Sequence, residues 1–251
     1  MSPQRRAWLL VAVVAAAAAH DGRGKRRGSE DQGAKPPLHV NCSELVSDAK
    51  DSSPIRSAQA AQSVVARHVA GLQLVEIGTR NGDGMACFAH FARTAAAVEM
   101  DPHYCNLLSE RSKAPSAGAT NFTVHCQAYE KVPGLDGDVF TWWQQFPNLK
   151  NEQVLRNLRQ RQLSGQIRSS AEAILLFEVG YGDDMRSYEG LRKIAQWDEV
   201  VEFNEAELCK SKYGKGRRWL INRAKGKFHV VGLRIADVAM DSASSASTKA
   251  T

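Results

Sequence analysis

The sequence has few cysteines, few aromatic residues and no long apolar segment. Its 251 residues include 8 Pro and 7% Phe, Trp and Tyr, against 43% hydrophobic and 24% charged residues overall. The cysteine count is odd and no two cysteines form a CxxC pair; they are Cys42, Cys87, Cys105, Cys126 and Cys209. This pattern predicts neither a disulfide framework nor a zinc site. Cys87 and Cys105 fall in helical patterns, so we expect them to be core residues.

Several common catalytic signatures are also absent. The sequence contains no HExxH pair, no GxSxG elbow and no GxxxxGK[ST] loop. Metalloprotease, serine-hydrolase and P-loop functions therefore have no support, and we expect no metal site. The composition is that of an ordinary globular protein, with room for one large domain.

The net charge of +6 is unevenly distributed. Residues 1–35 carry seven Lys or Arg and three Asp or Glu, so the rest of the chain is close to neutral. One basic run, Lys210 to Lys227, contains eight bases, no acid and the aromatic residues Tyr213 and Trp219. Such a run can bind nucleic acid or phosphorylated ligands. The alternative that we favour is a solvated loop.

The N-terminus has the parts of a targeting signal. Arg5 and Arg6 precede 13 apolar residues, 7–19, which is shorter than the ~20 residues of a membrane span. We expect a secretory signal peptide cleaved after Ala19, with a short anchor or an organelle presequence as alternatives. Glycosylation sequons at Asn41 and Asn121 agree with the secretory pathway.

The expected domain organisation follows from composition. We predict a signal peptide or short anchor at residues 1–19, a flexible linker at 20–52, a folded domain at 53–240 and a disordered tail at 241–251. Within the domain, strand and helix patterns alternate. The expected strands are 72–77, 95–98, 122–125, 138–143, 173–177, 199–203 and 228–235. Alternation predicts a parallel sheet covered on both faces, and the last two strands predict an antiparallel hairpin.

The most informative segment is a glycine-rich turn between the first strand and the following helix. It reads Gly78-x-x-x-Gly82-x-Gly84, with Glu76 two residues before the first glycine. Glycines let the backbone turn sharply and approach a ligand closely, and the helix that follows presents free N–H groups. The spacing differs from the G-x-G-x-x-G fingerprint of dinucleotide-binding proteins.

These residues resemble the class I S-adenosylmethionine-dependent methyltransferase family. The glycine-rich turn matches the first motif of that family, and Val98-Glu99-Met100-Asp101-Pro102 matches the second, an acid that ends the second strand. The resemblance extends from about Ser53 to Ile235. It implies a Rossmann-like three-layer α/β sandwich, with a seven-stranded, mostly parallel sheet and an antiparallel C-terminal hairpin. It also implies S-adenosylmethionine as the cofactor.

The resemblance implies a set of cofactor-binding residues. They are Glu76, Gly78, Thr79, Arg80, Gly82, Glu99, Met100, Gln127 and Ala128. Glu76 would hold the methionine amino end, Glu99 would accept from both ribose hydroxyls, and Met100 would pack on adenine. Gln127 stands where the family often has Asp, and its amide oxygen would contact the adenine amine.

The fourth strand departs from the family pattern. Trp143 follows Asp138 by five residues, where many members carry a metal-binding Asp or the Asn of an Asn-Pro-Pro-Tyr loop. We therefore expect neither of those chemistries. Trp142 and Trp143 would either wall a substrate pocket or pack in the core. No catalytic residue is assigned, because positioning can suffice for methyl transfer.

The sequence supports three functional hypotheses. The first is S-adenosylmethionine-dependent methyl transfer to an unidentified acceptor, expected to be a small molecule. The second is a methyltransferase-like binding module without turnover. The third is a nicotinamide-dependent oxidoreductase, because Glu99 lies 21 residues after Gly78, a distance that also suits a ribose-binding acid.

Overall fold

A seven-stranded sheet in the order β3-β2-β1-β4-β5-β7-β6 organises the protein. The computed structural model describes residues 39–47, 49, 59–113, 121–143, 149–178, 183–204 and 225–240, all within one unit, Pro37–Thr251. The predicted leader, the predicted tail and residues 210–224 of the basic run lie outside these residues. No helix among the described residues is long and apolar enough to cross a membrane.

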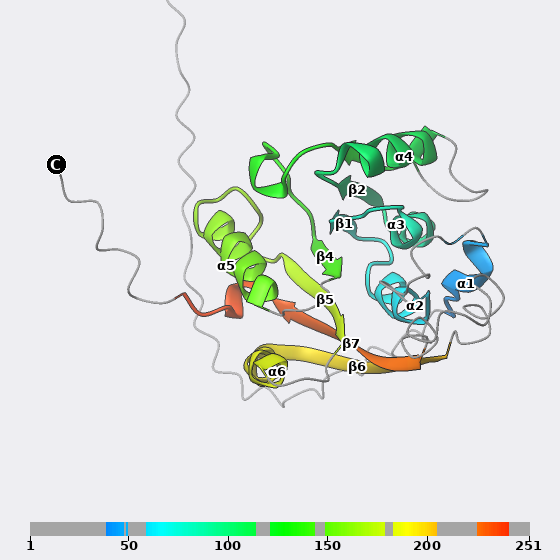
Figure 1. Cartoon of the computed structure of the whole chain (residues 1–251). Coiled ribbons are helices and arrows are strands. Elements are labelled where there is room, and N and C mark those ends of the chain that lie inside the picture. The colour runs from blue at the N-terminus through cyan, green and yellow to red at the C-terminus, as the bar shows by residue number, and fades with distance from the viewer. Residues whose placement is uncertain are drawn as a thin grey trace, which may run out of the picture. The chain divides into compact units, whose positions relative to one another are not determined.

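The strands lie where the sequence predicts them. They are β1 (Gln73–Ile77), β2 (Thr94–Val98), β3 (Thr123–His125), β4 (Val139–Trp143), β5 (Glu172–Glu178), β6 (Ala195–Asn204) and β7 (Lys225–Arg234). Strands β1 to β5 pair in parallel, and β7 runs antiparallel to both β5 and β6. The predicted parallel sheet with an antiparallel C-terminal hairpin is confirmed (Figure 1).

The helices either precede β1, as α1 and α2 do, or lie between strands. They are α1 (Cys42–Leu45), α2 (Gln59–His68), α3 (Asp83–Phe88), α4 (Pro102–Lys113), α5 (Leu149–Leu163) and α6 (Asp183–Ile194), with 3₁₀ turns η1 (Tyr129–Lys131) and η2 (Ile235–Asp237). Asp101 caps α4 as predicted, since its Oδ1 accepts from the His103 N–H at 2.8 Å.

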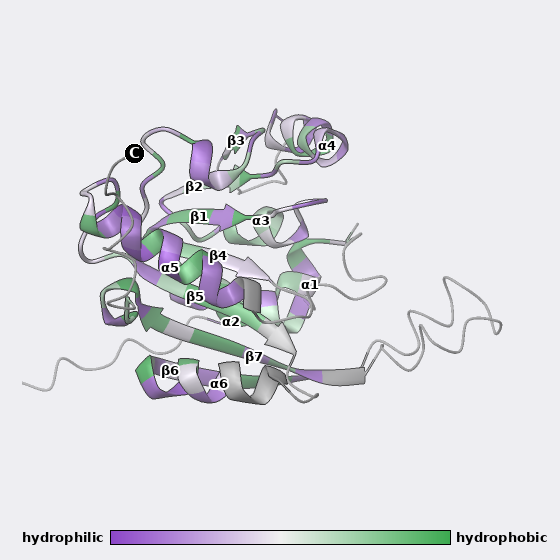
Figure 2. Ribbon diagram, turned by 60° about the vertical axis from the view of Figure 1, so that its left-hand side comes forward, coloured by the Kyte–Doolittle hydropathy of each residue, from purple (hydrophilic) through white to green (hydrophobic). Residues whose placement is uncertain are grey.

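The sheet carries a hydrophobic core on each face. One core joins α1, α2, α3 and Leu108 of α4 to one face, and the other joins α5 and α6 to the opposite face. Neighbouring strand residues alternate between them: Ile174 and Val230 belong to the first core, Leu175 and Val231 to the second. This alternation follows from the two-residue period of a strand. In Figure 2, β7 is mostly green, and α5 and α6 carry purple residues.

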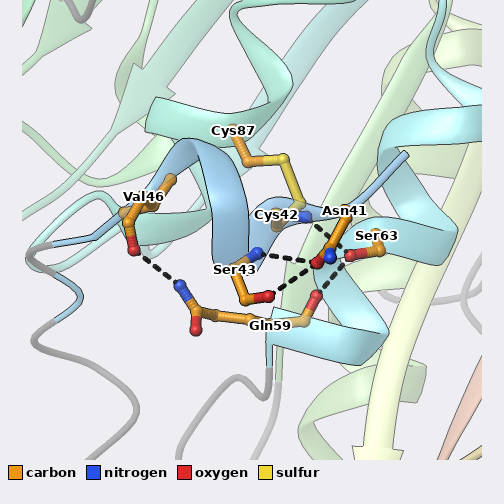
Figure 3. Close-up of a disulfide and its surroundings, with 7 residues drawn as sticks. All are labelled: Asn41, Cys42, Ser43, Val46, Gln59, Ser63 and Cys87. Atoms are coloured by element: carbon orange, nitrogen blue, oxygen red, sulfur yellow. Dashed lines mark hydrogen bonds between the residues drawn. A yellow bond between two sulfur atoms is a disulfide. The ribbon is translucent and has the colours of Figure 1, made fainter. Parts of the chain in front are cut away.

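The packed domain begins earlier than the predicted boundary at residue 53. Asn41 caps α1, with its Oδ1 accepting from the Ser43 N–H at 3.1 Å (Figure 3). Cys42 is fully buried in the first core, and Val46 is 3% exposed. Residues 40–46 therefore belong to the folded unit, although their composition predicts a linker.

Two disulfides correct the prediction that the cysteines form no disulfide framework. Cys42 of α1 bonds to Cys87 of α3, with Cα atoms 5.4 Å apart (Figure 3). Cys105 of α4 bonds to Cys126, which directly follows β3, with Cα atoms 5.6 Å apart. The partners are 45 and 21 residues apart in the chain, so only the packing of helices on the sheet brings them within bonding distance. Cys209 lies outside the described residues.

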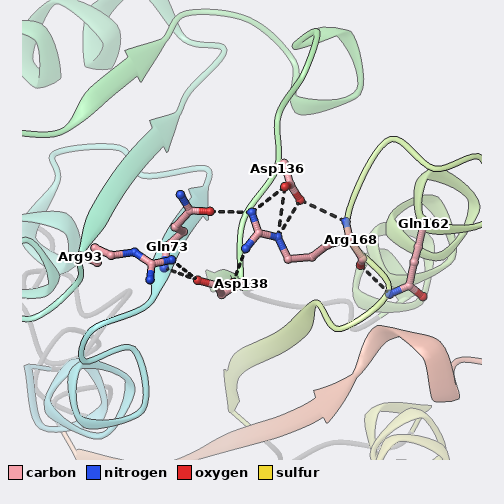
Figure 4. Close-up of polar contacts among 6 residues, drawn as sticks. All are labelled: Gln73, Arg93, Asp136, Asp138, Gln162 and Arg168. Atoms are coloured by element: carbon pink, nitrogen blue, oxygen red, sulfur yellow. Dashed lines mark hydrogen bonds and ion pairs between the residues drawn. The ribbon is translucent and has the colours of Figure 1, made fainter. Parts of the chain in front are cut away.

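An ion-pair network ties together the amino ends of the central strands. Arg168, in the loop before β5, contacts Asp136, Asp138 and Gln73 (Figure 4). Asp138 also accepts from the Gln73 N–H and from Arg93. Burial alone would raise the pKa of Asp136, but the hydrogen bonds and charge of Arg168 outweigh it and lower that pKa. The network therefore lies at the amino ends of the strands, whereas the glycine-rich turn lies at their carboxyl ends.

Candidate cofactor site

The glycine-rich turn leaves β1 and enters α3 through left-handed backbone. Gly78 and Gly82 have φ angles of +72° and +80°, where a side chain would be strained. The Gly78 N–H donates to the Val98 carbonyl at 2.8 Å, which links the turn to the end of β2. Thr79 is 5% exposed, and its hydroxyl donates to the Glu76 carbonyl at 3.1 Å. The turn is thereby held against two neighbouring strands.

Arg80 adopts the left-handed conformation without being glycine. Its φ is +55°, and it is the only non-glycine residue with positive φ among those described. Its N–H donates to Glu99 Oε2 at 2.9 Å, and its Nη2 donates to the Tyr104 hydroxyl at 2.6 Å. The guanidinium carbon lies 4.9 Å from the centre of the Tyr104 ring. The Arg80 side chain therefore packs on α4.

One face of α4 supports the turn, a role that the sequence reasoning missed. Tyr104, Leu108 and Arg111 recur at i, i+4 and i+7, so they share a helix face. Leu108 packs against Gly82, and Arg111 Nη1 donates to the Asn81 carbonyl at 2.7 Å and to Asp83 at 3.1 Å. The helical spacing was visible in the sequence, but nothing in it showed what this face contacts.

The Glu99 carboxylate organises the loops at the end of β2. Glu99 is 6% exposed. Its Oε1 accepts from the N–H groups of Met100 and Asp101 at 2.8 and 2.9 Å, and its Oε2 accepts from Arg80. A carboxylate offers about four acceptor positions, so about one remains for a ligand.

A cavity of about 330 Å³ opens at the carboxyl ends of β1 and β2. It is lined by Ile77, Gly78, Glu99, Met100, Gln127, Ala128, Tyr129, Glu130, Gln153 and Val154. Five of these are residues that the resemblance implies. Met100 is 73% exposed, so its apolar side chain is accessible at the cavity. Ligands of open α/β sheets bind at this end of the strands.

The other four implied cofactor residues do not line the cavity. Thr79, Arg80 and Gly82 shape the turn behind it, as described above. Glu76 lies under the first turn of α3, where a Cβ on Gly84 would lie 2.6 Å from Glu76 Oε1. The sequence reasoning also missed five lining residues: Ile77, Tyr129, Glu130, Gln153 and Val154.

The segment that follows Ala128 is anchored from α5. Arg161 is 7% exposed and donates to the carbonyls of Tyr129 and Val132 at 2.8 and 3.1 Å. Burial, followed by the charge of Glu130, raises the pKa of Tyr129 above its usual range. Tyr129 therefore remains a neutral phenol at this wall of the cavity.

Neither tryptophan of β4 lines the described cavity. Trp142 is 3% exposed in the second core, and its Nε1 donates to Asn151 Oδ1 at 2.8 Å. Trp143 packs against the first core, edge-on to Phe228 with ring centres 6.2 Å apart. Adjacent strand residues face opposite sides of the sheet, so the pair cannot form one wall. Trp142 thus takes the core position that the sequence left open.

Known proteins resemble this chain in structure and not in sequence. No protein-family model and no curated protein matches the sequence. Among solved structures, a candidate RNA methyltransferase from Pyrococcus horikoshii is similar at 10% identity and a TM-score of 0.49, over 71% of this chain and 85% of its own. A precorrin-6y C5,15-methyltransferase from Geobacter metallireducens is similar at 12% identity and a TM-score of 0.46, over 70% and 88%.

The strand order, with β7 antiparallel between β5 and β6, decides the fold. The chain has the Rossmann-like three-layer α/β fold, with an antiparallel C-terminal hairpin, that the sequence predicts. A third similar structure is a ribosomal protein L11 methylase from Lactobacillus delbrueckii, at 12% identity and a TM-score of 0.43, over 70% of this chain and 77% of its own. At these identities the likeness concerns the fold and not the reaction, because one fold hosts many functions.

Proposed function

We propose that this methyltransferase-fold protein binds S-adenosylmethionine and transfers its methyl group to an acceptor, which we expect to be a small molecule. The observation that carries the proposal is the cavity that gathers Gly78, Glu99, Met100, Gln127 and Ala128 at the carboxyl ends of the strands. When bound, S-adenosylmethionine supplies an electrophilic methyl group on a sulfonium. The protein's own part is to position the reactants and exclude water.

The residues present fit an adenosyl ligand. The remaining acceptor position of Glu99 suits one ribose hydroxyl, rather than both as the resemblance implies. The exposed Met100 offers an apolar surface for the adenine face, and the Gln127 amide can accept from the adenine amine. No described atom lies within 4 Å of a Cβ position on Gly78, so a ligand can approach its backbone closely.

The sheet topology speaks against the nicotinamide alternative. The usual dinucleotide-binding sheet has the order 3-2-1-4-5-6. Here the antiparallel β7 lies between β5 and β6. A binding module without turnover remains the competing proposal, because methyl transfer by positioning requires no dedicated base that the structure could reveal.

We also propose that the protein works in the secretory pathway, with an organelle reached through the leader as the alternative. The two disulfides support an oxidising compartment, since disulfides persist there and are rare in the cytosol. Expressing the full chain in secretory cells and sequencing the N-terminus of the mature protein tests this proposal. Recovery in the cytosol with an intact residue 1 would contradict it.

Nucleic acid binding through Lys210 to Lys227 is a weaker proposal, which a salt titration of RNA binding tests.

The cofactor proposal is tested by calorimetric titration of the full chain with S-adenosylhomocysteine, with NADH as the competing ligand. We expect binding of the first at micromolar concentration and none of the second. The absence of binding at millimolar S-adenosylhomocysteine would refute the cofactor assignment. Isotope-labelled S-adenosylmethionine with a panel of small acceptors then separates an enzyme, which yields labelled product, from a binding module, which yields none.

A further inference from the structure

The Cys105–Cys126 disulfide joins the two sides of the candidate cofactor cavity. One side is the turn from β2 into α4, with Glu99 and Met100. The other is the segment after β3, where Cys126 directly precedes Gln127 and Ala128. Neither cysteine lines the cavity, but each is close in the chain to residues that do.

Cys105 fixes the first side. It is 3% exposed on α4, and its Sγ lies 3.3 Å from the carbonyl oxygen of Glu99. The Cys105 N–H donates to the Asp101 carbonyl at 2.9 Å, which places it in the first turn of the helix. Because the Glu99 carboxylate itself bonds to Met100 and Asp101, this turn is rigidly connected to the sulfur atom.

The second side has few other attachments near Gln127. Strand β3 has three residues, lies at the edge of the sheet and pairs with β2 alone. At the last residue of β3, the His125 carbonyl accepts from the Glu99 N–H at 3.0 Å. The next described anchor is Arg161, which holds Tyr129 and Val132. Between these two anchors the covalent attachment is Cys126.

We infer that the Cys105–Cys126 disulfide positions Gln127 and Ala128 opposite Glu99 and Met100, and so raises the affinity of the cavity for an adenosyl ligand. This inference rests on the proposed cofactor. Both cysteines are positioning residues, acting through the segments they join. Without the bond, the edge segment would have to be ordered at the moment of binding, and that ordering costs affinity. Arg161 would still hold the far end of the segment, so we expect partial loss.

The two disulfides differ in accessibility, which lets them be separated experimentally. Cys126 is an exposed residue, whereas Cys42 and Cys87 have no exposed surface. Reductant can therefore reach the Cys105–Cys126 disulfide in the folded protein before it reaches the Cys42–Cys87 disulfide. In reduction by a water-soluble phosphine, the phosphine gives two electrons and takes the oxygen of water to become its oxide. The two protons of that water end on the sulfur atoms as thiols.

The test compares two double variants of the full chain, Cys105→Ala/Cys126→Ala and Cys42→Ala/Cys87→Ala. Each variant loses one disulfide, but only the first loses the disulfide that joins the two sides of the cavity. We expect the first to raise the dissociation constant of S-adenosylhomocysteine about tenfold, and the second to leave it within about twofold. Thermal unfolding of both variants measures the separate effect on stability.

Equal dissociation constants in the wild type and the first variant would overturn the inference, as would equal weakening in both variants. If the first variant does not fold, wild-type protein is mildly reduced and alkylated, and mass mapping confirms modification of Cys105 and Cys126 alone. The same tenfold criterion then applies. Failure of the unmodified protein to bind S-adenosylhomocysteine would refute the proposed function and the inference with it, so the two failures are distinguishable.

Discussion

The side chain of Leu108 packs directly against Gly82, so closely that a Cβ on Gly82 would lie 2.6 Å from Leu108 Cδ2. The two residues are 26 positions apart, one in the glycine-rich turn and one in the middle of α4. Leu108 is fully buried, so it cannot move aside easily. Position 82 therefore requires glycine for two reasons: the backbone there is left-handed, and a side chain would clash with Leu108 of α4.

We expect Gly82→Ala to destabilise the protein by about 2–4 kcal/mol, from backbone strain together with the clash against Leu108. S-adenosylhomocysteine affinity should fall with it, because the turn shapes the cavity. The control is Gly134→Ala, which has φ of +64° but no described atom within 4 Å of the added Cβ. It should cost about 1 kcal/mol and leave affinity unchanged. Urea unfolding and calorimetry measure both effects, and equal destabilisation by the two variants would contradict the clash.

Glu99→Gln should weaken S-adenosylhomocysteine binding about 10- to 100-fold. The amide has fewer acceptor positions than the carboxylate, so it cannot serve Arg80, Met100, Asp101 and a ribose hydroxyl together. Glu110→Gln, at an exposed position of α4, is the matched control and should bind as the wild type does. An unchanged affinity in Glu99→Gln would show that the ribose assignment is wrong.

Trp142→Phe should lower the free energy of unfolding by about 1–2 kcal/mol, because it removes buried volume and the hydrogen bond to Asn151. Ligand affinity should not change, since Trp142 lies in the core and outside the cavity lining. Denaturant unfolding and calorimetry on the same sample test both points. A loss of ligand affinity without a loss of stability would show that Trp142 contributes to the binding site and not to the core.

Arg168→Met should reduce stability at neutral pH, with an effect that shrinks in acid. The pKa of Asp136 is lowered in the folded protein from its ordinary value of 3.8, so its contribution is present above that value. The contribution is lost as the pH falls through the lowered pKa. Urea midpoints of wild type and variant should therefore differ more at about pH 7 than at about pH 2.5. Arg192→Met, which breaks an exposed pair with Glu189, should show little effect at either pH.

Much of the fold could be predicted from the chain alone. The apolar runs of β1 and β5 form strands, Asp101 caps the start of α4, and the alternation of strands and helices gives a parallel sheet for β1 to β5. Each of these signals is local, since it depends on side-chain period and capping within a few residues. The glycine spacing and Glu76 likewise predicted the turn after β1, and Glu99 predicted the loop after β2.

The tertiary structure decided which distant residues meet. It paired Cys42 with Cys87 and Cys105 with Cys126, brought Val40 and Val46 into the core, and set Leu108 against Gly82. It also separated the predicted site into residues that line the cavity and residues, such as Arg80 and Thr79, that support the turn behind it. These contacts join segments more than 20 residues apart in the chain or depend on which face a side chain takes. Local sequence patterns carry no information about such distances, because the sheet and its helices must first assemble before the partners approach.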